Sequence, residues 1–269
     1  MLSTIQQIWM WIFDRFILYP LMRWIAPKLG VKFMNLGYVL DENDQKIKQF
    51  LERIPEYETN GPEKAHLNLY EKALSLHDSY PTFENLEILE VSCGQANSLK
   101  WIQRHHGPKS LIGCDKIVSN SKNLENVIYG DAQNLPFKDN SFDIVLNVEA
   151  SHLYMDCAKF FEEVHRVLRP NGYFLWLDLR YPNEVEILKR TTSRAGLKLE
   201  ILNDITGNVI CGLHETTVKY DRILKKSPKL IQLLFSNVLR TTYCAPGTQT
   251  YNRLVKRERL YLAGKWTKP

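Results

Sequence analysis

Five short runs rich in β-branched and aromatic residues alternate with helical stretches from residue 86 onward. This alternation is typical of α/β proteins with a doubly wound, mostly parallel sheet. The five runs span 86–93, 110–115, 126–132, 142–149 and 172–179. Beyond them we expect a helix over 183–194, a strand over 197–202, helices over 208–238 and a closing strand over 259–266. The sequence therefore predicts a seven-stranded sheet with helices on both faces.

The connections between the runs differ in length. The connection before the fifth run carries clear helix signals: Asp156 can cap its start, apolar residues follow at helical spacing, and the "PNG" of 170–172 ends it. By contrast, only eleven residues separate Asp115 from Val127. A parallel crossover usually needs a dozen or more, so we expect a loop or a single turn there.

The chain divides into an N-terminal amphipathic or helical extension, residues 1–60, and a domain over 61–269 with a helical lid at about 205–250. Apolar residues within the first 16 recur at the spacing of one helix face. Asp14 and Arg15 interrupt them, so no stretch of ~20 uncharged apolar residues can span a bilayer. An interfacial helix and a helix packed on the domain remain the two interpretations. The interfacial one would place three tryptophans at headgroup depth: Trp9, Trp11 and Trp24.

Composition limits the kind of partner. Five cysteines without a C-x-x-C pair favour a reducing compartment, with neither a disulfide framework nor a metal site. We expect a cytoplasmic protein, with peripheral contact with an intracellular membrane as the alternative. The formal net charge of +5 is spread out except at 222–230 and 254–260. We interpret these two runs as solvated faces, with contact with an anionic membrane surface or nucleic acid as the alternative. The sequence has no concentrated run of basic residues with interleaved aromatics, so it gives no indication of nucleic-acid binding.

Small or acidic residues follow four successive runs, where a doubly wound sheet binds its ligands. A dinucleotide site would need three glycines in G-x-G-x-x-G, but Ser92, Gly94 and Asn97 stand at those positions. NAD is therefore disfavoured, and a nucleoside ligand without phosphates fits better.

The acidic residues at the strand ends indicate which nucleoside the site would bind. Asp115 can accept both ribose hydroxyls, Asp131 can accept from an adenine amino group, and the Ala132 N–H can donate to the ring. Glu90 can serve a cationic amino group, directly or through its neighbours. Ribose, adenine and a zwitterion together describe S-adenosylmethionine.

Four segments, "ILEVSCG", "GDAQNLPF", "FDIVLNVEASHLY" and "EVHRVLRPNGYF", resemble the class I S-adenosylmethionine-dependent methyltransferases. More narrowly, the chain resembles the phthiotriol/phenolphthiotriol dimycocerosate methyltransferase and fatty-acid O-methyltransferase group over most of its length. The resemblance implies the Rossmann-like class I methyltransferase fold and methyl transfer to a hydroxyl or carboxyl oxygen of a lipid-like small molecule. It also implies the residues that hold the cofactor: Tyr70, Glu90, Ser92, Gly94, Asp115, Asp131, Ala132 and Asn147.

The chain departs from this group at two places. Ala96 and Asn97 stand where the group has glycines, which narrows the space for the methionine part of the cofactor. The crossover after Asp115 is also shorter by roughly two helical turns, at about 3.6 residues per turn.

The residues after the fourth run lie where the acceptor must be. His152 is the natural general base for an alcohol, because imidazole titrates near neutrality, and Glu149 can orient it or accept from the substrate. The alternatives are a histidine bonded to the backbone and a structural strand-end acid. We expect His105 and His106 to be solvated. Aromatic residues would suit a lipid chain, with core packing as the alternative for each: Phe33, Tyr38, Tyr220, Phe235, Tyr243 and Tyr251.

Two other functions stay open. A sterol- or quinone-type C-methyltransferase would use the same cofactor on a carbon acceptor. A non-catalytic binding protein would keep the fold without the reaction.

Overall fold

The computed structural model describes residues 31–116, 126–226 and 229–269. For several residues between 229 and 242 it describes the backbone alone. The helix expected within the first 16 residues lies outside these ranges, as does most of the segment after Asp115. Both expectations therefore stay predictions.

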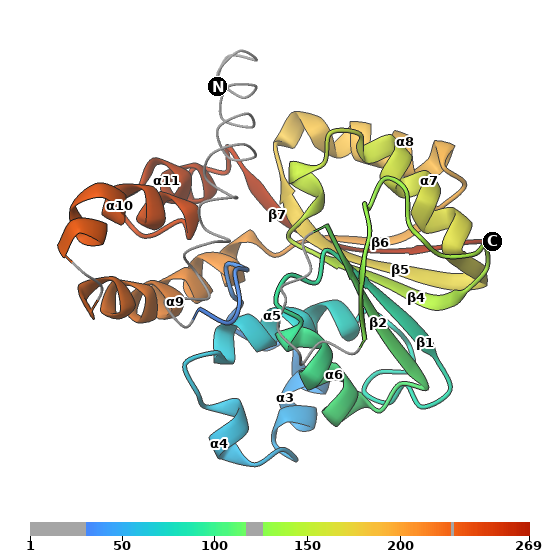
Figure 1. Cartoon of the computed structure of the whole chain (residues 1–269), viewed down its shortest axis with the longest axis horizontal. Helices are drawn as coiled ribbons and strands as arrows, with labels where there is room; N and C mark the ends of the chain where they lie inside the picture. Colours follow the sequence, from blue (N-terminus) through green and yellow to red (C-terminus); the bar gives the residue numbers. More distant parts are fainter. Residues whose placement is uncertain (1–30, 117–125, 227–228) are drawn as a thin grey trace.

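Within the described residues, seven strands form one sheet in the order β3-β2-β1-β4-β5-β7-β6 (Figure 1). Strands β1 to β5 pair in parallel, whereas β7 is antiparallel to both β5 and β6. The predicted doubly wound, mostly parallel sheet is confirmed. The strands are β1 (Glu87–Val91), β2 (Ser110–Asp115), β3 (Val127–Tyr129), β4 (Phe142–Val148), β5 (Leu168–Arg180), β6 (Lys198–Asp204) and β7 (Leu260–Thr267).

Helices cover both faces of the sheet and one of its ends (Figure 1). Helices α5 (Lys64–Leu74) and α6 (Asn97–His106) lie on one face, and α7 (Cys157–Val167) and α8 (Val185–Arg194) on the other. No helix in the described part of the chain is both long and apolar enough to cross a bilayer. The remaining helices are α3 (Gln45–Leu51), α4 (Glu56–Thr59), α9 (Thr206–Lys226), α10 (Lys229–Thr242) and α11 (Gln249–Val255), with short 3-10 turns η3 (Ser151–Leu153) and η4 (Pro182–Glu184).

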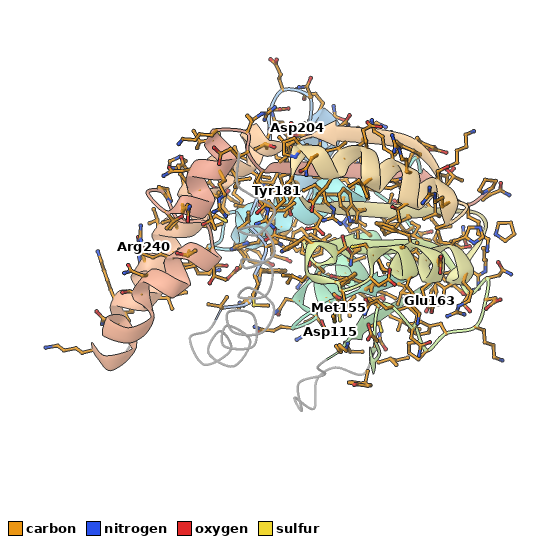
Figure 2. All side chains as sticks on the ribbon, turned by 90° about the horizontal axis from the view of Figure 1, so that it is seen from above. Asp115, Met155, Glu163, Tyr181, Asp204 and Arg240 are labelled. Atoms are coloured by element: carbon orange, nitrogen blue, oxygen red, sulfur yellow. The ribbon has the colours of Figure 1, made fainter. Side chains whose placement is uncertain are left out.

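Figure 2 shows the arrangement from above. Arg240, on α10, lies at one end of the molecule and Glu163, on α7, toward the other. Helices α9, α10 and α11 occupy the region predicted as a lid.

The central strands are mostly apolar because the sheet is buried on both faces. Successive residues of each strand point to opposite faces, and two separate core clusters result. The cluster toward α5 includes Ile88, Leu146, Leu175 and Leu177, and the cluster toward α7 includes Leu89, Val145, Phe174 and Trp176.

Local signals set the ends of α7 as predicted. The Asp156 carboxylate accepts a hydrogen bond of 3.0 Å from the Lys159 N–H, which caps the first turn. Phe160, Phe161 and Val164 form its buried face. The helix ends at Val167, before the "PNG" segment.

Residues 31–54 pack on the same core as the sheet. Phe33, Leu36, Tyr38, Ile47 and Phe50 are buried in the cluster toward α5. The predicted division of the chain at residue 60 stays a prediction.

The prediction that His106 is solvated is wrong. His106 follows Ile102 by four residues and so shares the buried face of α6. Its Nδ1 lies 2.7 Å from the Pro81 carbonyl oxygen and its Nε2 lies 3.0 Å from Glu71 Oε1. The buried Glu71 carboxylate also accepts from Trp101 Nε1 and the Tyr80 hydroxyl, each at 2.6 Å.

We expect Glu71→Ala to lower the free energy of unfolding by about 3–5 kcal/mol, because it leaves several buried donors without an acceptor. Urea unfolding followed by circular dichroism measures the change. The matched control is Glu186→Ala, which removes an exposed carboxylate paired with Lys189 and should leave stability unchanged. Equal effects of the two substitutions would contradict this assignment.

Candidate functional site

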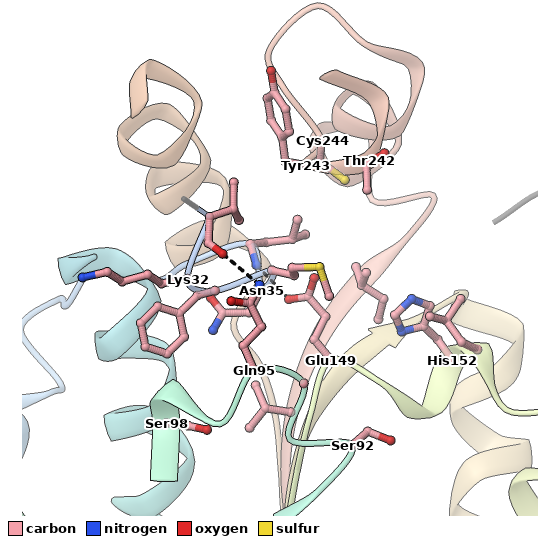
Figure 3. A pocket seen from close by; sticks show the side chains of 18 of the residues that line it. Lys32, Asn35, Ser92, Gln95, Ser98, Glu149, His152, Thr242, Tyr243 and Cys244 are labelled. Atoms are coloured by element: carbon pink, nitrogen blue, oxygen red, sulfur yellow. Dashed lines mark hydrogen bonds between the residues drawn. The ribbon is translucent and has the colours of Figure 1, made fainter. Parts of the chain in front are cut away.

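A cavity opens at the carboxyl ends of β1 and β4 (Figure 3). It encloses about 1240 Å³ of space not filled by atoms, its open mouth included. Its walls are residues 31–36, the loop after β1, residues 148–153 after β4, and residues 241–244 at the end of α10.

The loop after β1 exposes backbone to this cavity. Ser92, Gly94 and Ala96 all have positive φ, at 61°, 57° and 57°. A Cβ built on Gly94 would meet nothing within 4 Å, so the loop leaves open space beside its backbone. The Gly94 N–H donates to Asp115 Oδ2 at 2.8 Å. This bond joins the end of β1 to the end of β2.

Tyr70 and Ser98 bring hydroxyl groups to the cavity wall. Both donate to the buried carboxyl of Glu90, Tyr70 at 3.1 Å and Ser98 at 2.6 Å. Burial raises the pKa of Glu90 to about 7. Glu90 therefore lies behind Tyr70 and Ser98, and any influence it has on a ligand in the cavity passes through them.

Besides Glu90, three predicted cofactor residues at the ends of β2 and β3 lie outside the cavity wall: Asp115, Asp131 and Ala132. Asp115 is buried at the end of β2, directly behind Gly94. Asp131 and Ala132 follow β3, and Asp131 accepts from Lys116 Nζ at 2.6 Å and from the Gln133 N–H at 3.0 Å. Burial acts to raise the pKa of Asp131, but these hydrogen bonds outweigh it and hold the pKa below its usual range.

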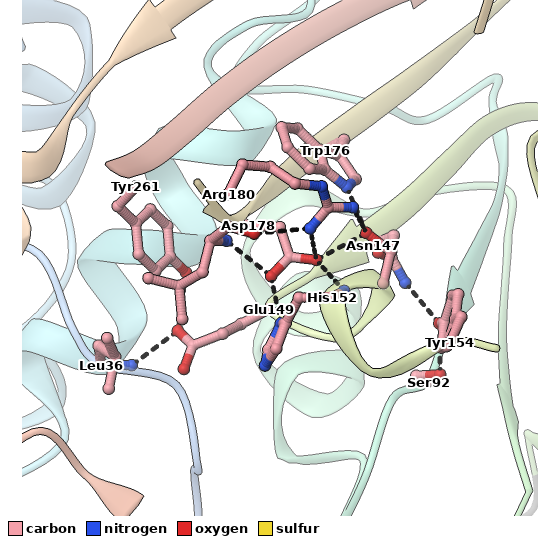
Figure 4. Close-up of polar contacts among 12 residues, drawn as sticks. Leu36, Ser92, Asn147, Glu149, His152, Tyr154, Trp176, Asp178, Arg180 and Tyr261 are labelled. Carbon is pink, nitrogen blue, oxygen red and sulfur yellow. Dashed lines mark hydrogen bonds and ion pairs between the residues drawn. The ribbon is translucent and has the colours of Figure 1, made fainter. Parts of the chain in front are cut away.

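Asn147 links β4 to the loop after β1. Its Nδ2 donates to the Val91 carbonyl at 2.9 Å and to the Tyr154 hydroxyl at 3.0 Å, and Tyr154 also bonds Ser92 Oγ at 2.6 Å (Figure 4). The buried Oδ1 of Asn147 has no hydrogen-bond partner among the described residues. Asn147 therefore supports the loop and does not line the cavity.

His152 lines the cavity and is held by a buried carboxylate. Its Nδ1 lies 2.6 Å from Asp178 Oδ1, and its backbone N–H donates to Oδ2 at 2.8 Å (Figure 4). Asp178 also accepts from Ser151 Oγ at 2.6 Å and from Arg180 at 3.2 Å. The histidine ring is thus bonded to a side chain, and not to the backbone as in the alternative interpretation.

The charge of Asp178 determines the form of His152. Burial acts to raise the pKa of Asp178, but its interactions with His152 and Arg180 outweigh burial and hold the pKa well below its usual range. An ionised carboxylate only accepts hydrogen bonds, so Nδ1 must carry the proton that it shares with Asp178. In the neutral ring this leaves Nε2 as a proton acceptor.

Glu149 lines the cavity beside His152 and has a positive φ of 54°. Its Oε2 accepts from the Leu36 N–H at 2.9 Å and from the Tyr261 hydroxyl at 2.7 Å. Burial of the carboxyl raises its pKa to about 8. At neutral pH the group is therefore mostly uncharged.

Residues 31–36 form the side of the cavity that faces the loop after β1. Gln95 Nε2 donates to the Val31 carbonyl and Asn97 Nδ2 to the Lys32 carbonyl, each at 2.9 Å. Asn97 is one of the two residues that stand where the related methyltransferases have glycines, and its side chain contacts this segment.

The predicted aromatic residues divide between the cavity and other contacts. Phe33, Tyr220 and Tyr243 line the cavity. Tyr38 instead bonds Asp44, and Tyr251 bonds His214. The side chain of Phe235 lies outside the described residues.

Sequence reasoning missed Asp178, Tyr154 and Tyr261. Asp178 had a usable signal, because it is a lone acid within the apolar run 172–179, and buried acids gather at functional sites. Tyr154 and Tyr261 had none, since their partners are set by the tertiary fold.

Comparison with known proteins places the chain in a family. A family model described as "Methyltransferase domain" matches residues 89–176. The chain is 33% identical over 237 residues to the probable phthiotriol/phenolphthiotriol dimycocerosates methyltransferase 2 of Mycobacterium ulcerans, covering 85% of this chain and 87% of that protein. It is also 31% identical to a fatty-acid O-methyltransferase of Mycolicibacterium smegmatis, covering 75% and 73%.

The same fold occurs in solved structures. The [4+2]-cyclase SpnF superposes with a TM-score of 0.61 at 15% identity, covering 93% of this chain and 94% of that one. This similarity shows the fold alone. Membership of the family follows from the sequence identity to the curated relatives. The chain belongs to the class I S-adenosylmethionine-dependent methyltransferases, in the group of the phthiotriol/phenolphthiotriol dimycocerosates methyltransferases, and S-adenosylmethionine is its cofactor.

Proposed function

We propose that this enzyme transfers the methyl group of S-adenosylmethionine to an oxygen atom of a lipid-like acceptor, and that His152 contacts that oxygen. The single observation that carries the proposal is the 2.6 Å bond between His152 Nδ1 and the buried Asp178 in the cavity wall. The names of two relatives, a dimycocerosates methyltransferase and a fatty-acid O-methyltransferase, support a lipid acceptor.

The residues around the loop after β1 suit the cofactor. Gly94 leaves open space at the cavity wall, and Tyr70 and Ser98 offer hydroxyls backed by Glu90. In this proposal Asp115 accepts the ribose hydroxyls. Asp131 and Ala132 would contact the adenine, and Ser92 and Asn147 would keep the loop in place. When bound, the cofactor supplies a methyl group on a cationic sulfur.

The enzyme's own contribution is alignment and proton acceptance. Methyl transfer is an in-line displacement, which requires the reacting atoms ~3–3.5 Å apart and aligned. If the acceptor is a hydroxyl, His152 Nε2 takes its proton while Asp178 holds the ring and stabilises the imidazolium, whereas a carboxylate acceptor needs no proton transfer. Arg180 already pairs with Asp178 at 3.2 Å before the proton moves, which helps to keep this carboxylate ionised.

The cavity also suits an aliphatic chain. Its wall includes apolar residues from four parts of the fold: Phe33, Met34, Val148, Leu153 and Leu179. Peripheral membrane contact through the first 16 residues is part of this proposal, as a route for a lipid acceptor.

The proposal predicts an oxygen-bound methyl group. Protein incubated with carbon-13-methyl S-adenosylmethionine and an organic extract of cellular lipids should give one product whose labelled carbon resonates with O-methyl groups. A resonance in the C-methyl range would instead support the sterol- or quinone-type reaction. Absence of labelled product together with absence of cofactor binding would support the non-catalytic alternative.

The His152–Asp178 pair predicts a dependence on the acceptor. With a long-chain alcohol, His152→Gln and Asp178→Asn should each lower kcat by about 10²- to 10⁴-fold, the usual contribution of a general base. With a carboxylate, which is already a nucleophile, the loss should be less than about 10-fold. Steady-state kinetics on both acceptors, with S-adenosylhomocysteine binding as the check on folding, measures this. Equal losses on the two acceptors would contradict a proton-accepting role.

The cofactor assignment predicts weaker binding in Asp115→Ala. The change removes the expected ribose acceptor and the anchor of Gly94, so the Kd for S-adenosylmethionine should rise roughly 10- to 100-fold, as for hydrogen bonds to a charged group. Calorimetric titration measures the Kd. Asp139→Ala, which removes an exposed carboxylate paired with Arg166, is the control and should bind normally. An unchanged Kd in Asp115→Ala would refute the assignment.

The state of Glu149 predicts a pH dependence of stability. The unfolded chain releases this proton above about pH 4.5, whereas the folded protein keeps it until about pH 8. Relative to Glu149→Gln, the wild type should therefore lose up to about 1.4 kcal/mol of stability per pH unit as pH rises through this window. Chemical unfolding of both proteins from pH 5 to 8 tests this, and a difference that stays constant or grows in favour of the wild type would contradict it.

A further inference from the structure

Arg259 stands out among the charged residues of the cavity wall. It directly precedes β7, and it lines the cavity together with Glu149 and His152. Its Nε is buried and has no hydrogen-bond partner in the described part of the chain. A buried donor without a partner costs roughly 1–3 kcal/mol, so a ligand atom that accepts its hydrogen would remove this cost.

The setting of Arg259 differs from that of its neighbour in the basic run 254–260. Arg257 forms an ion pair of 2.9 Å with Asp204 and is half-exposed. The Arg259 guanidinium instead lies 5.6 Å from the centroid of the Tyr181 ring, a cation–π contact that orients it without using its N–H donors.

No acid near this end of the cavity forms an ion pair with Arg259 in the described chain. Asp178 is already paired with Arg180 at 3.2 Å and with His152 at 2.6 Å. Glu149 uses Oε2 for Leu36 and Tyr261, and the charge of Arg259 acts on it only by attraction over a longer distance, which tends to lower the Glu149 pKa. The Arg259 Nε–H therefore has no acceptor within the described protein and is left for a ligand.

We propose that Arg259 binds the carboxylate of the acceptor and selects long-chain carboxylic acids over alcohols. This inference rests on the proposed function. A guanidinium presents parallel N–H donors that match the two oxygens of a carboxylate. The apolar wall formed by Phe33, Met34 and Leu153 then accommodates the aliphatic chain.

The reaction balances without a further reactant. A carboxylate oxygen forms a bond to the methyl carbon as the carbon–sulfur bond breaks, and the bonding electron pair stays on sulfur. The products are a methyl ester and S-adenosylhomocysteine. Because the carboxylate loses its charge as the bond forms, Arg259 acts on recognition of the acid more than on the rate of the methyl transfer step.

The test is binding of dodecanoate and of dodecanol, as a matched pair, to the full chain saturated with S-adenosylhomocysteine. Arg259→Gln should raise the Kd for dodecanoate roughly 10- to 100-fold and leave that for dodecanol unchanged. Arg259→Lys should restore part of the preference. Arg257→Gln is the control, and it should bind both ligands as the wild type does. Equal binding of dodecanoate by the wild type and Arg259→Gln, equal loss of both ligands, or a wild-type preference for dodecanol would overturn the proposal.

A second measurement separates this inference from the proposed function. Transfer of labelled methyl to dodecanoate, giving an ester that alkali cleaves, is followed in the same proteins. Binding that depends on Arg259 without transfer would support the inference and contradict the proposed function. Transfer to lipid oxygen with acid binding that ignores Arg259 would overturn the inference and leave the proposed function standing.

Discussion

Parallel pairing of β1, β2, β4 and β5 is the constraint on which the site depends. Because these strands run in the same direction, the segments that follow them meet at one edge of the sheet. The Gly94 N–H reaches Asp115 across the ends of β1 and β2, and His152, after β4, reaches Asp178 within β5. Residues more than twenty positions apart in the chain thus become hydrogen-bonded neighbours, and the cavity forms between them.

The cavity has two chemically different ends. Near the loop after β1, hydroxyl groups of Tyr70 and Ser98 cover the buried Glu90, which suits a polar ligand. At the opposite end, Arg180 pairs with Asp178, while the Arg259 Nε has no hydrogen-bond partner in the described chain. In the proposed function the first end binds the cofactor and the second binds the acceptor.

Much of the fold could be predicted from local signals, and most of the site chemistry could not. Strands such as 142–148 are recognisable because burial on both faces requires mostly apolar residues, and Asp156 is recognisable as a cap because capping is local. The strand-end acids also followed from topology. Asp178 and Tyr261 act through hydrogen-bond partners that are 26 and 112 residues away in the chain. Arg259 matters because its Nε has no hydrogen-bond partner in the described chain. No short-range sequence pattern indicates either situation. The prediction for His106 failed for another reason. Histidine is a polar residue type, which suggested exposure to solvent, but the position of His106 on α6 faces the core.

A crystal structure of the protein with S-adenosylhomocysteine would test how the cavity holds its cofactor. We expect the ribose hydroxyls to bond Asp115, the amino-acid end to lie near Tyr70 and Ser98, and the sulfur to face the part of the cavity that His152 lines. A ligand bound with its sulfur directed away from His152, or with its ribose away from Asp115, would contradict the proposed roles of these residues.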